Sequence, residues 1–232
     1  MLILAIDTAL DACSAAVLDT ETAELRALES LPMKRGHAEA LMPLIARVMQ
    51  SAELGFIALD RIAVTVGPGS FTGLRVGISA ARGLALASGR PAVGLTTLSA
   101  YAATIVGRSK SAPVISAIDA RHDHVYFQIV AGDGSQLVRP CVAPVDEAIA
   151  ASQFGAPHLV GNAANILAER WPKDIPQPVA VDAQPAPDIG WVAWLGAAAD
   201  PATNPARPSY LRAPDAKPPA QLPLAAQAAS SR

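Results

Sequence analysis

The sequence predicts an α/β protein with two related lobes, each built from a mixed β-sheet with flanking helices. Apolar runs typical of strands alternate along the chain with segments of helical periodicity. In addition, the theme of an apolar run, an acidic turn and a returning apolar run occurs twice, first at Asp7 and again at Asp119. We expect a first lobe at residues 1–103, a second lobe at residues 104–211, and a disordered Pro- and Ala-rich tail at residues 212–232.

The first lobe should open with a β-hairpin followed by an amphipathic helix. Two apolar runs, residues 2–6 and 13–19, are joined by a short turn, which is typical of a hairpin. Pro43 lies inside the helical segment 37–49 and removes one backbone donor, so this helix should begin late or kink there. The apolar side chains that define the helix recur at i, i+3, i+4 and i+7, and they are Leu41, Leu44, Ile45 and Val48.

A buried parallel strand at residues 61–66 should lead into a glycine-rich helix at residues 70–88. Ser70 is placed to cap the start of this helix. Three glycines follow within the helix, although glycine costs roughly 1 kcal/mol relative to alanine in a helix interior. Such a cost is accepted where a ligand or another backbone must approach closely.

The second lobe should repeat the strand, acidic turn and strand theme within residues 112–130. A strand, a turn and a helix follow in residues 157–171, and residues 188–199 should form the last helix. The twice-repeated pattern is that of the actin/Hsp70/sugar-kinase superfold. In that superfold two such turns face each other across a cleft and hold the phosphates of a nucleotide.

Composition narrows the class of protein. The chain is 51% hydrophobic with a net charge of −2 and has no long basic run, which argues against a protein that binds nucleic acid alone. Cys13 and Cys141 form no metal or redox motif, so we expect reduced thiols. No uninterrupted apolar stretch reaches the length of a membrane span, and no basic region precedes the first apolar run. A cytoplasmic protein without a membrane segment is therefore expected.

Six segments resemble the bacterial TsaB family in their order and spacing, over roughly residues 1–212. They are LAIDTALDACSAAVLD, RGHAEALMPLI, VTVGPGSFTGLRVGISAARGLAL, GLTTLSAYA, IDARHDHVYF and PSYLR, and GPGSFTGLRVG is the most specific block. TsaB is a partner subunit of the machinery that makes N6-threonylcarbamoyladenosine at position 37 of tRNAs reading ANN codons. Its paralogue TsaD performs the transfer chemistry, and TsaE is the associated ATPase. The family has also been labelled a glycoprotease of the M22 type by similarity to TsaD.

The resemblance implies a non-catalytic scaffold subunit that dimerises with TsaD. TsaE and tRNA would join through the assembled complex, and the chain would form a homodimer when alone. The alternative is an enzyme, either an actin-like-fold ATPase or a peptidase that acts on its partner.

The residues themselves predict neither a metal site nor a nucleophile. TsaD-like enzymes hold a metal with a His-x-x-x-His pair, and no pair among the histidines here has that spacing. No Gly-x-Ser-x-Gly elbow surrounds Ser70, and Cys13 lies in an apolar strand where a packed thiol is ordinary. We therefore expect no catalytic residue and no metal. The four histidines are His37, His122, His124 and His158.

Nucleotide binding in the cleft stays open at this point. Turns that grip phosphate bring backbone N–H groups close to the ligand and therefore use glycine. The turn after Asp7 contains Thr8 and no glycine, and Asp119 is followed by Ala120-Arg121 where a working member of the superfold commonly has Asp-x-Gly. The expectation is no cofactor of the chain's own, with ATP or ADP bound weakly or with help from an interface. The predicted weak nucleotide cleft comprises Asp7, Thr8, Asp119 and Gly161.

Gly73 and Gly77 share one helix face, which makes a flat stripe for close packing. The stripe fits a helix of a second subunit, the chain's own sheet, or an anion at the helix N-terminus. In the TsaB family these two helices contact TsaD and form the homodimer, so the resemblance favours a partner interface. The predicted interface comprises His37, Leu41, Leu44, Ile45, Val48, Ser70, Gly73, Leu74, Gly77, Ile78 and Ala81.

Overall fold

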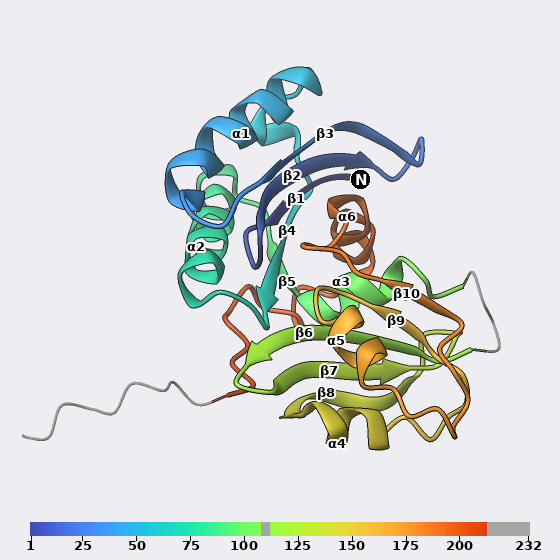
Figure 1. The fold of residues 1–232 in the computed structure, drawn as a ribbon. Coiled ribbons are helices and arrows are strands. Elements are labelled where there is room, and N and C mark those ends of the chain that lie inside the picture. The colour runs from blue at the N-terminus through green and yellow to red at the C-terminus, as the bar shows by residue number, and fades with distance from the viewer. Residues whose placement is uncertain (108–111, 213–232) are drawn as a thin grey trace, which may run out of the picture.

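The computed structural model describes residues 1–107 and 112–212, which form two five-stranded sheets with helices on both faces (Figure 1). The strand order is β3-β2-β1-β4-β5 in the first sheet and β8-β7-β6-β9-β10 in the second. Numbered along the chain within each sheet, both orders are 3-2-1-4-5, so the predicted repeat of topology is confirmed. The predicted tail lies outside the described residues from residue 213 onward.

The first sheet is mixed. Its central strand β1 pairs antiparallel with β2 and parallel with β4, so the predicted hairpin and the predicted parallel strand are both present. The edge strand β3 is mostly exposed, and polar and apolar residues are mixed along it. The strands are β1 (Leu2–Asp7), β2 (Ala12–Asp19), β3 (Glu24–Pro32), β4 (Arg61–Gly67) and β5 (Ala92–Thr96).

Two helices, α1 (His37–Ser51) and α2 (Phe71–Ser88), cover one face of the first sheet, with the short 3-10 helix η1 (Phe56–Ala58) between them in sequence. Alternate residues of β1 explain the layering, because Leu4 and Ile6 pack against these helices while Ile3 and Ala5 face the other way. Helix α1 begins at His37 and contains Pro43, so the expectation of a late start is wrong.

The second sheet has the same mixed pairing, with β6 central between β7 and β9. Helix α3 (Thr97–Ala103) packs on one face of it, and α4 (Val145–Ala150) and α5 (Ala164–Glu169) pack on the other. The strands are β6 (Val114–Arg121), β7 (His124–Val130), β8 (Gln136–Pro144), β9 (His158–Val160) and β10 (Ala180–Asp182).

The last helix, α6 (Ile189–Ala198), returns to the first sheet. Its buried residues Ile189, Val192 and Ala193 pack on the face of the sheet that carries Ile3 and Ala5. The predicted second lobe, residues 104–211, includes α6, whereas in the structure α6 packs on the first sheet. The helix is apolar on nearly every side, so its own sequence does not specify which sheet it covers.

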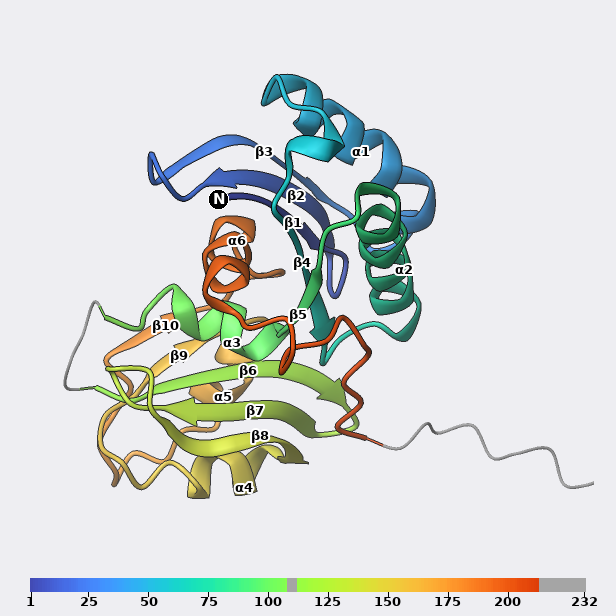
Figure 2. The ribbon, with the colours of Figure 1, turned by 180° about the vertical axis from the view of Figure 1, so that it is seen from behind.

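Residues 204–211, the C-terminal strap, run from α6 along the open edge of the first sheet (Figure 2). The backbone N–H of Gly94 in β5 donates to the carbonyl of Asn204 at 2.9 Å. Further on, the N–H of Ser209 donates to the carbonyl of Val66 at 2.8 Å. The strap thus satisfies backbone groups at the edge of β5 and at the end of β4, which would otherwise offer a template for pairing with another chain.

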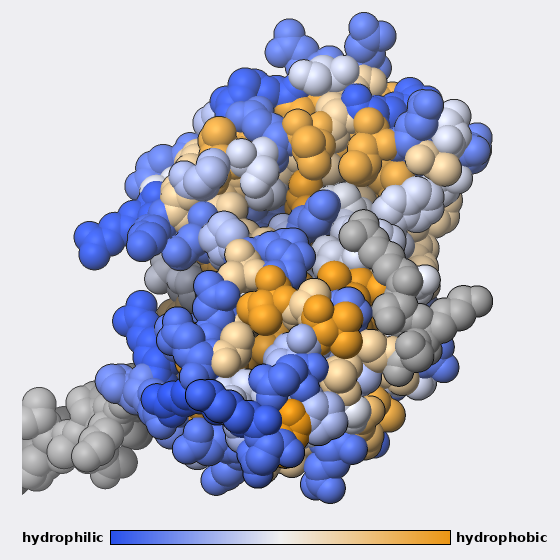
Figure 3. Space-filling view, turned by 45° about the vertical axis from the view of Figure 1, so that its right-hand side comes forward, coloured by the Kyte–Doolittle hydropathy of each residue, from blue (hydrophilic) through white to orange (hydrophobic). Residues whose placement is uncertain are grey.

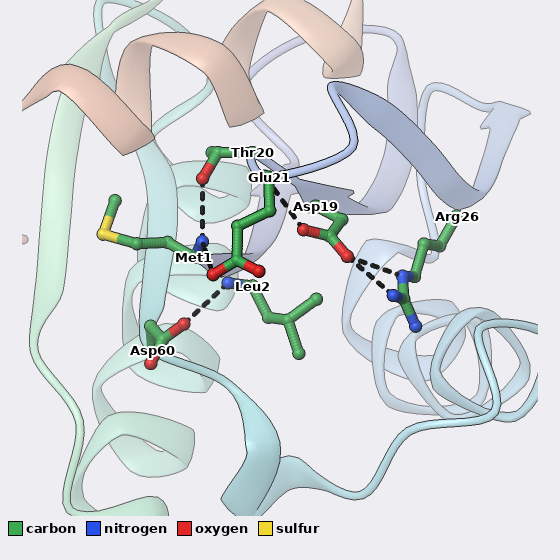
Figure 4. Close-up of polar contacts among 7 residues, drawn as sticks. All are labelled: Met1, Leu2, Asp19, Thr20, Glu21, Arg26 and Asp60. Atoms are coloured by element: carbon green, nitrogen blue, oxygen red, sulfur yellow. Dashed lines mark hydrogen bonds and ion pairs between the residues drawn. The ribbon is translucent and has the colours of Figure 1, made fainter.

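Polar contacts fix the far ends of the first strands (Figure 4). The N–H of Leu2 donates to Oδ2 of Asp60 at 2.8 Å, which joins the start of β1 to the segment before β4. At the end of β2, Asp19 accepts a hydrogen bond from the N–H of Glu21 and two from the guanidinium of Arg26. These donors hold the pKa of Asp19 below its usual range.

The surface seen in Figure 3 carries apolar residues around its middle and polar residues at its margins. The chain exposes apolar side chains on β3, on α6 and at β10, and they are Leu25, Leu28, Trp194, Val179 and Val181. Leu25 lies against α6 next to Gly190. None of the helices in the described part of the chain combines the length and apolar character that a bilayer crossing requires.

Candidate functional site

The two acidic turns face each other across a cleft of about 590 Å³. The turn after β1 and the start of α2 line one side, where Asp11 and Phe71 are found. The end of β6 and the loop after β9 line the other side, with Asp119, Arg121 and Asn162. The cleft thus lies between equivalent positions of the two repeats.

Backbone donors of both turns already bind acceptors of the chain itself. The N–H of Ala9 donates to Oδ1 of Asp7 at 3.2 Å, and the N–H of Arg121 donates to Oδ1 of Asp119 at 2.7 Å. The N–H of Asp119 donates to Oδ1 of Asn162 at 2.9 Å. These are the kind of groups that cradle phosphate in nucleotide-binding turns, and here each has an internal partner.

Asp7 lies at the end of β1 and is fully buried. Its Oδ1 accepts hydrogen bonds from the Thr65 hydroxyl and from the N–H of Ala9. Burial raises the pKa of this carboxyl to about 6, although both hydrogen bonds and the charge of His37 act in the opposite direction. Within residues 1–107 and 112–212, its Oδ2 has no hydrogen-bond partner. Asp7 therefore joins β1 to β4 beneath the cleft instead of lining it.

Thr8 explains the glycines of α2. The Thr8 hydroxyl donates to the carbonyl of Gly73 at 2.7 Å. A Cβ atom at Gly73 or at Gly77 would stand closer than 3.0 Å to Thr8. The glycines therefore allow α2 to lie directly on the turn after β1. This favours the alternative in which they serve packing within the chain. In contrast, a Cβ at Gly83 would have no neighbour within 4 Å.

His37 attaches the same turn to α1. It is buried, and its Nε2 forms a hydrogen bond with the carbonyl of Leu10 at 3.0 Å. Together with Thr8, and with the N–H of Ser70 that donates to the carbonyl of Ala9 at 2.7 Å, this contact fixes the turn to the first residues of both helices. A displacement of the turn would therefore disturb α1 and α2 together.

The apolar residues predicted for the partner interface point into the chain's own core. They pack against the first sheet, and all are at most 3% exposed; they are Leu41, Leu44, Ile45, Val48, Leu74, Ile78 and Ala81. Together with the buried His37, Gly73 and Gly77, they cannot form the outer surface of these helices in this conformation. Ser70 is the exposed member of the predicted set, and its Oγ accepts from the N–H of Gly73 at 3.3 Å, which confirms it as the helix cap. An apolar stripe at helical spacing shows that one face of a helix is buried. It does not show whether that face packs against the chain's own sheet or against another subunit.

The outer faces of α1 and α2 present a different set of residues, which sequence reasoning missed. Leu86 is 86% exposed and Met42 is 48% exposed. Ala46, Ser79 and Gly83 are exposed on the same two helices, and Arg82 and Arg90 line the same surface hollow as Leu86. These outer residues could have been found from the sequence as the positions on the side of each helix opposite to the buried apolar stripe. We define the outer helix face by Met42, Ala46, Ser79, Gly83 and Leu86.

Gly161 is predicted to belong to the weak nucleotide cleft, but it is not among the residues that line the cleft. Its φ is +110°, and a Cβ there would stand closer than 3.0 Å to the carbonyl of Ala117 in β6. The glycine therefore packs on the second sheet, and the next residue, Asn162, reaches the cleft. Asp119 is exposed at the cleft as expected from its turn.

Histidine and cysteine side chains are dispersed. Among the described residues, no three His, Cys, Asp or Glu side chains are grouped so that they could hold a metal ion. Nδ1 of His124 bonds to the carbonyl of His122 at 2.7 Å. Cys13 is a buried free thiol whose pKa is raised to about 11 by burial, with a further contribution from Asp7. Such a thiol is a weak nucleophile.

Comparison with known proteins gives a consistent result. The family model described as TsaD, tRNA N6-adenosine threonylcarbamoyltransferase, matches residues 32–184. The chain is 36% identical over 137 residues to the tRNA threonylcarbamoyladenosine biosynthesis protein TsaB of Haemophilus influenzae. That match covers 59% of this chain and 54% of the relative. The Escherichia coli protein of the same description is 37% identical over 127 residues, covering 55% and 54%.

The matched part thus spans about half the length of these curated relatives. An uncharacterized protein of Mycobacterium tuberculosis is 34% identical over 219 residues, which are 93% of this chain and 94% of the relative. The solved structure of YeaZ from Pseudomonas aeruginosa superposes with a TM-score of 0.75 at 29% identity, covering 90% of this chain and 99% of that one. Since the family model covers more than half of the chain and curated TsaB proteins match it at 36% and 37% identity, the chain belongs to the TsaD-related family and, within it, to the TsaB group.

Proposed function

We propose that this chain is a non-catalytic partner subunit in the biosynthesis of tRNA threonylcarbamoyladenosine, and that it docks a TsaD-related subunit through the outer helix face. In this proposal TsaE and tRNA join the assembled complex, and the same face forms a homodimer when the partner is absent. The pathway is supported by the curated TsaB relatives. The docking role is supported by one observation above all, the exposure of Leu86 and Met42 on two adjacent helices.

The physical argument for docking is the shape and composition of that face. Leu86 and Met42 offer apolar area, and the small side chains of Ala46, Ser79 and Gly83 allow a partner helix to approach. A stable interface buries about 800 Å² on each partner, an area that two helices of this length can supply together with their flanks. The buried stripe on the opposite side fixes the helices to the sheet, so the docking face is held rigidly.

The hydrogen bonds at the cleft support the part of the proposal in which the partner subunit, and not this chain, carries out the transfer reaction. Three N–H groups of the turns at the cleft, those of Ala9, Asp119 and Arg121, donate to side chains of the chain itself, so a phosphate bound by these groups would have to displace those acceptors. Weak binding of ATP or ADP, helped by a partner interface, is a second proposal that the position of the cleft between the two repeated turns favours. A thermal shift with Mg-ATP tests it, because a ligand at 100 times its dissociation constant stabilises by about 2.7 kcal/mol.

The test of docking is co-purification with the cognate TsaD subunit. Gly83→Arg places a long charged side chain on the outer helix face, where the structure has open space, so the fold should be kept. Ala150→Arg is the matched control, because it adds the same side chain to an exposed position of α4 in the second lobe. We expect wild type and Ala150→Arg to retain the partner and Gly83→Arg to lose it, with all three melting cooperatively. Equal retention by Gly83→Arg would contradict the proposed docking face.

A further inference from the structure

We propose that three stacked side chains at the mouth of the cleft, Tyr210, Phe71 and Arg75, form a platform on which an unpaired RNA base stacks. These three residues are called the aromatic platform below. The inference rests on the proposed role in tRNA modification, which makes RNA the substrate of the assembly. It goes further by assigning a direct RNA contact to this chain.

The geometry of the platform is that of a ladder of planar groups. The rings of Phe71 and Tyr210 have centroids 5.7 Å apart and planes inclined by 28°. The guanidinium carbon of Arg75, one helical turn after Phe71, lies 3.9 Å from the centroid of the Phe71 ring. Phe71 is 49% exposed and Tyr210 is 46% exposed, so the ladder is open to solvent. Exposed aromatic rings interleaved with arginine are the surface on which unpaired bases stack.

The platform is also held in place before any ligand arrives. Tyr210 belongs to the C-terminal strap, which the hydrogen bond from the N–H of Ser209 to the carbonyl of Val66 fixes at 2.8 Å. Phe71 is the first residue of α2, directly after the cap Ser70. Two segments far apart in the sequence therefore present their rings together, and little conformational entropy remains to be lost when a base binds.

The charges beside the platform fit the edge of a base better than a phosphate. Phe71 also lines the cleft, and the charged residues that line it are Asp11, Asp119 and Arg121. Two carboxylates against one guanidinium weaken the binding of a phosphate inside the cleft by the chain alone. Carboxylates do accept hydrogen bonds from the exocyclic amino groups that adenine, cytosine and guanine carry. Arg75 at the rim offers a cationic group to the RNA backbone.

The experiment uses an anticodon stem-loop RNA with 2-aminopurine at an unpaired position of the loop, because stacking quenches the fluorescence of this base. The full chain is titrated alone at low salt and then in complex with the cognate TsaD subunit. Tyr210→Leu removes the ring, and Tyr210→Phe keeps it. Phe154→Ala is the matched control, because Phe154 is 45% exposed and lies in the second lobe between α4 and β9.

We expect wild type, Tyr210→Phe and Phe154→Ala to quench the probe and to bind the RNA alike. Tyr210→Leu should abolish the quenching and weaken RNA binding by about tenfold, which corresponds to about 1.4 kcal/mol. Arg75→Gln should also weaken binding and reduce its dependence on salt. Melting temperatures of all variants close to that of wild type show that the effects are local.

Three results would overturn the proposal. The first is quenching and affinity that Tyr210→Leu leaves unchanged, or no quenching by wild type. The second is a Tyr210→Leu chain that loses the TsaD subunit while the chain alone still quenches the probe, which would make the platform a protein contact. The third is free adenosine binding as tightly as the RNA, which would make it a nucleoside site. Since the titration of the chain alone needs no partner, its outcome is independent of whether the outer helix face docks TsaD.

Discussion

Replacing Gly73 by alanine should destabilise the chain, although alanine is the better helix former. The added Cβ would stand closer than 3.0 Å to the backbone carbonyl of Thr8, so the turn after β1 or the start of α2 must shift. Overpacking of this kind costs about 1–3 kcal/mol, and the hydrogen bond from Thr8 to Gly73 contributes about 1 kcal/mol that the shift would weaken. The gain in helix propensity is about 1 kcal/mol.

The net loss for Gly73→Ala is therefore about 2 kcal/mol, equivalent to a decrease in melting temperature of about 4–8 °C for a chain of this size. Gly83→Ala in the same helix is the matched control, since its Cβ would meet nothing within 4 Å. It should raise stability by about 1 kcal/mol through propensity alone. Urea denaturation followed by circular dichroism measures both. If Gly73→Ala were as stable as Gly83→Ala, the close approach of Thr8 would not be the reason for the glycine.

Three further predictions concern other parts of the chain. Since the pKa of Asp7 rises from 3.8 to about 6 on folding, the native state binds a proton in this window, and the free energy of unfolding should fall by about 3 kcal/mol as pH rises through it. Asp7→Asn should remove this fall in urea titrations at pH 4 and pH 7, and an unchanged fall would contradict the assignment. His122 has a φ of +49° between two further left-handed residues, so His122→Gly should raise stability in urea by about 1 kcal/mol, and a loss would show that the turn is not strained. Nη1 of Arg61 donates to the carbonyls of Gly196, Ala197 and Ala199 at the end of α6, so Arg61→Met should cost about 2 kcal/mol. In this variant the fluorescence of the two tryptophans of α6 should change before the main unfolding transition. If fluorescence and unfolding changed together, at the midpoint of wild type, Arg61 would not hold α6 in place.

The local sequence pattern was enough to predict those elements of the first sheet that are buried and formed by one continuous apolar run. The hairpin and the strand RIAVTV were predictable because their apolar runs are short and bounded, and α2 because its spacing and its cap agree. Strand β3 was missed because it is an exposed edge carrying Glu24, Arg26 and Glu29. The short strand β10 owes its existence to its pairing with β9, a contact that no local pattern encodes.

The candidate site was predictable in part. The positions of the acidic turns followed from the repeated strand theme, and the structure places both at one cleft. The outer helix face was not predictable, because the apolar residues that signal a helix are the ones its own sheet buries. The aromatic platform joins residues 71 and 210, whose proximity depends on α6 and the strap returning to the first sheet. Sequence periodicity has no information on such long-range returns.

The return of α6 also determines when the first lobe can be completed during synthesis. The face of the first sheet that carries Ile3, Ala5 and Ala63 is covered by Ile189 and Val192. These two residues leave the ribosome only after the whole second sheet has been made. Until then the apolar face of the nascent first sheet is open to solvent or to a chaperone. The second sheet, in contrast, is built from one uninterrupted stretch of the chain. The second lobe is in effect an insertion into the first. A chain shortened before residue 189 would lack the helix that covers the strands synthesised first.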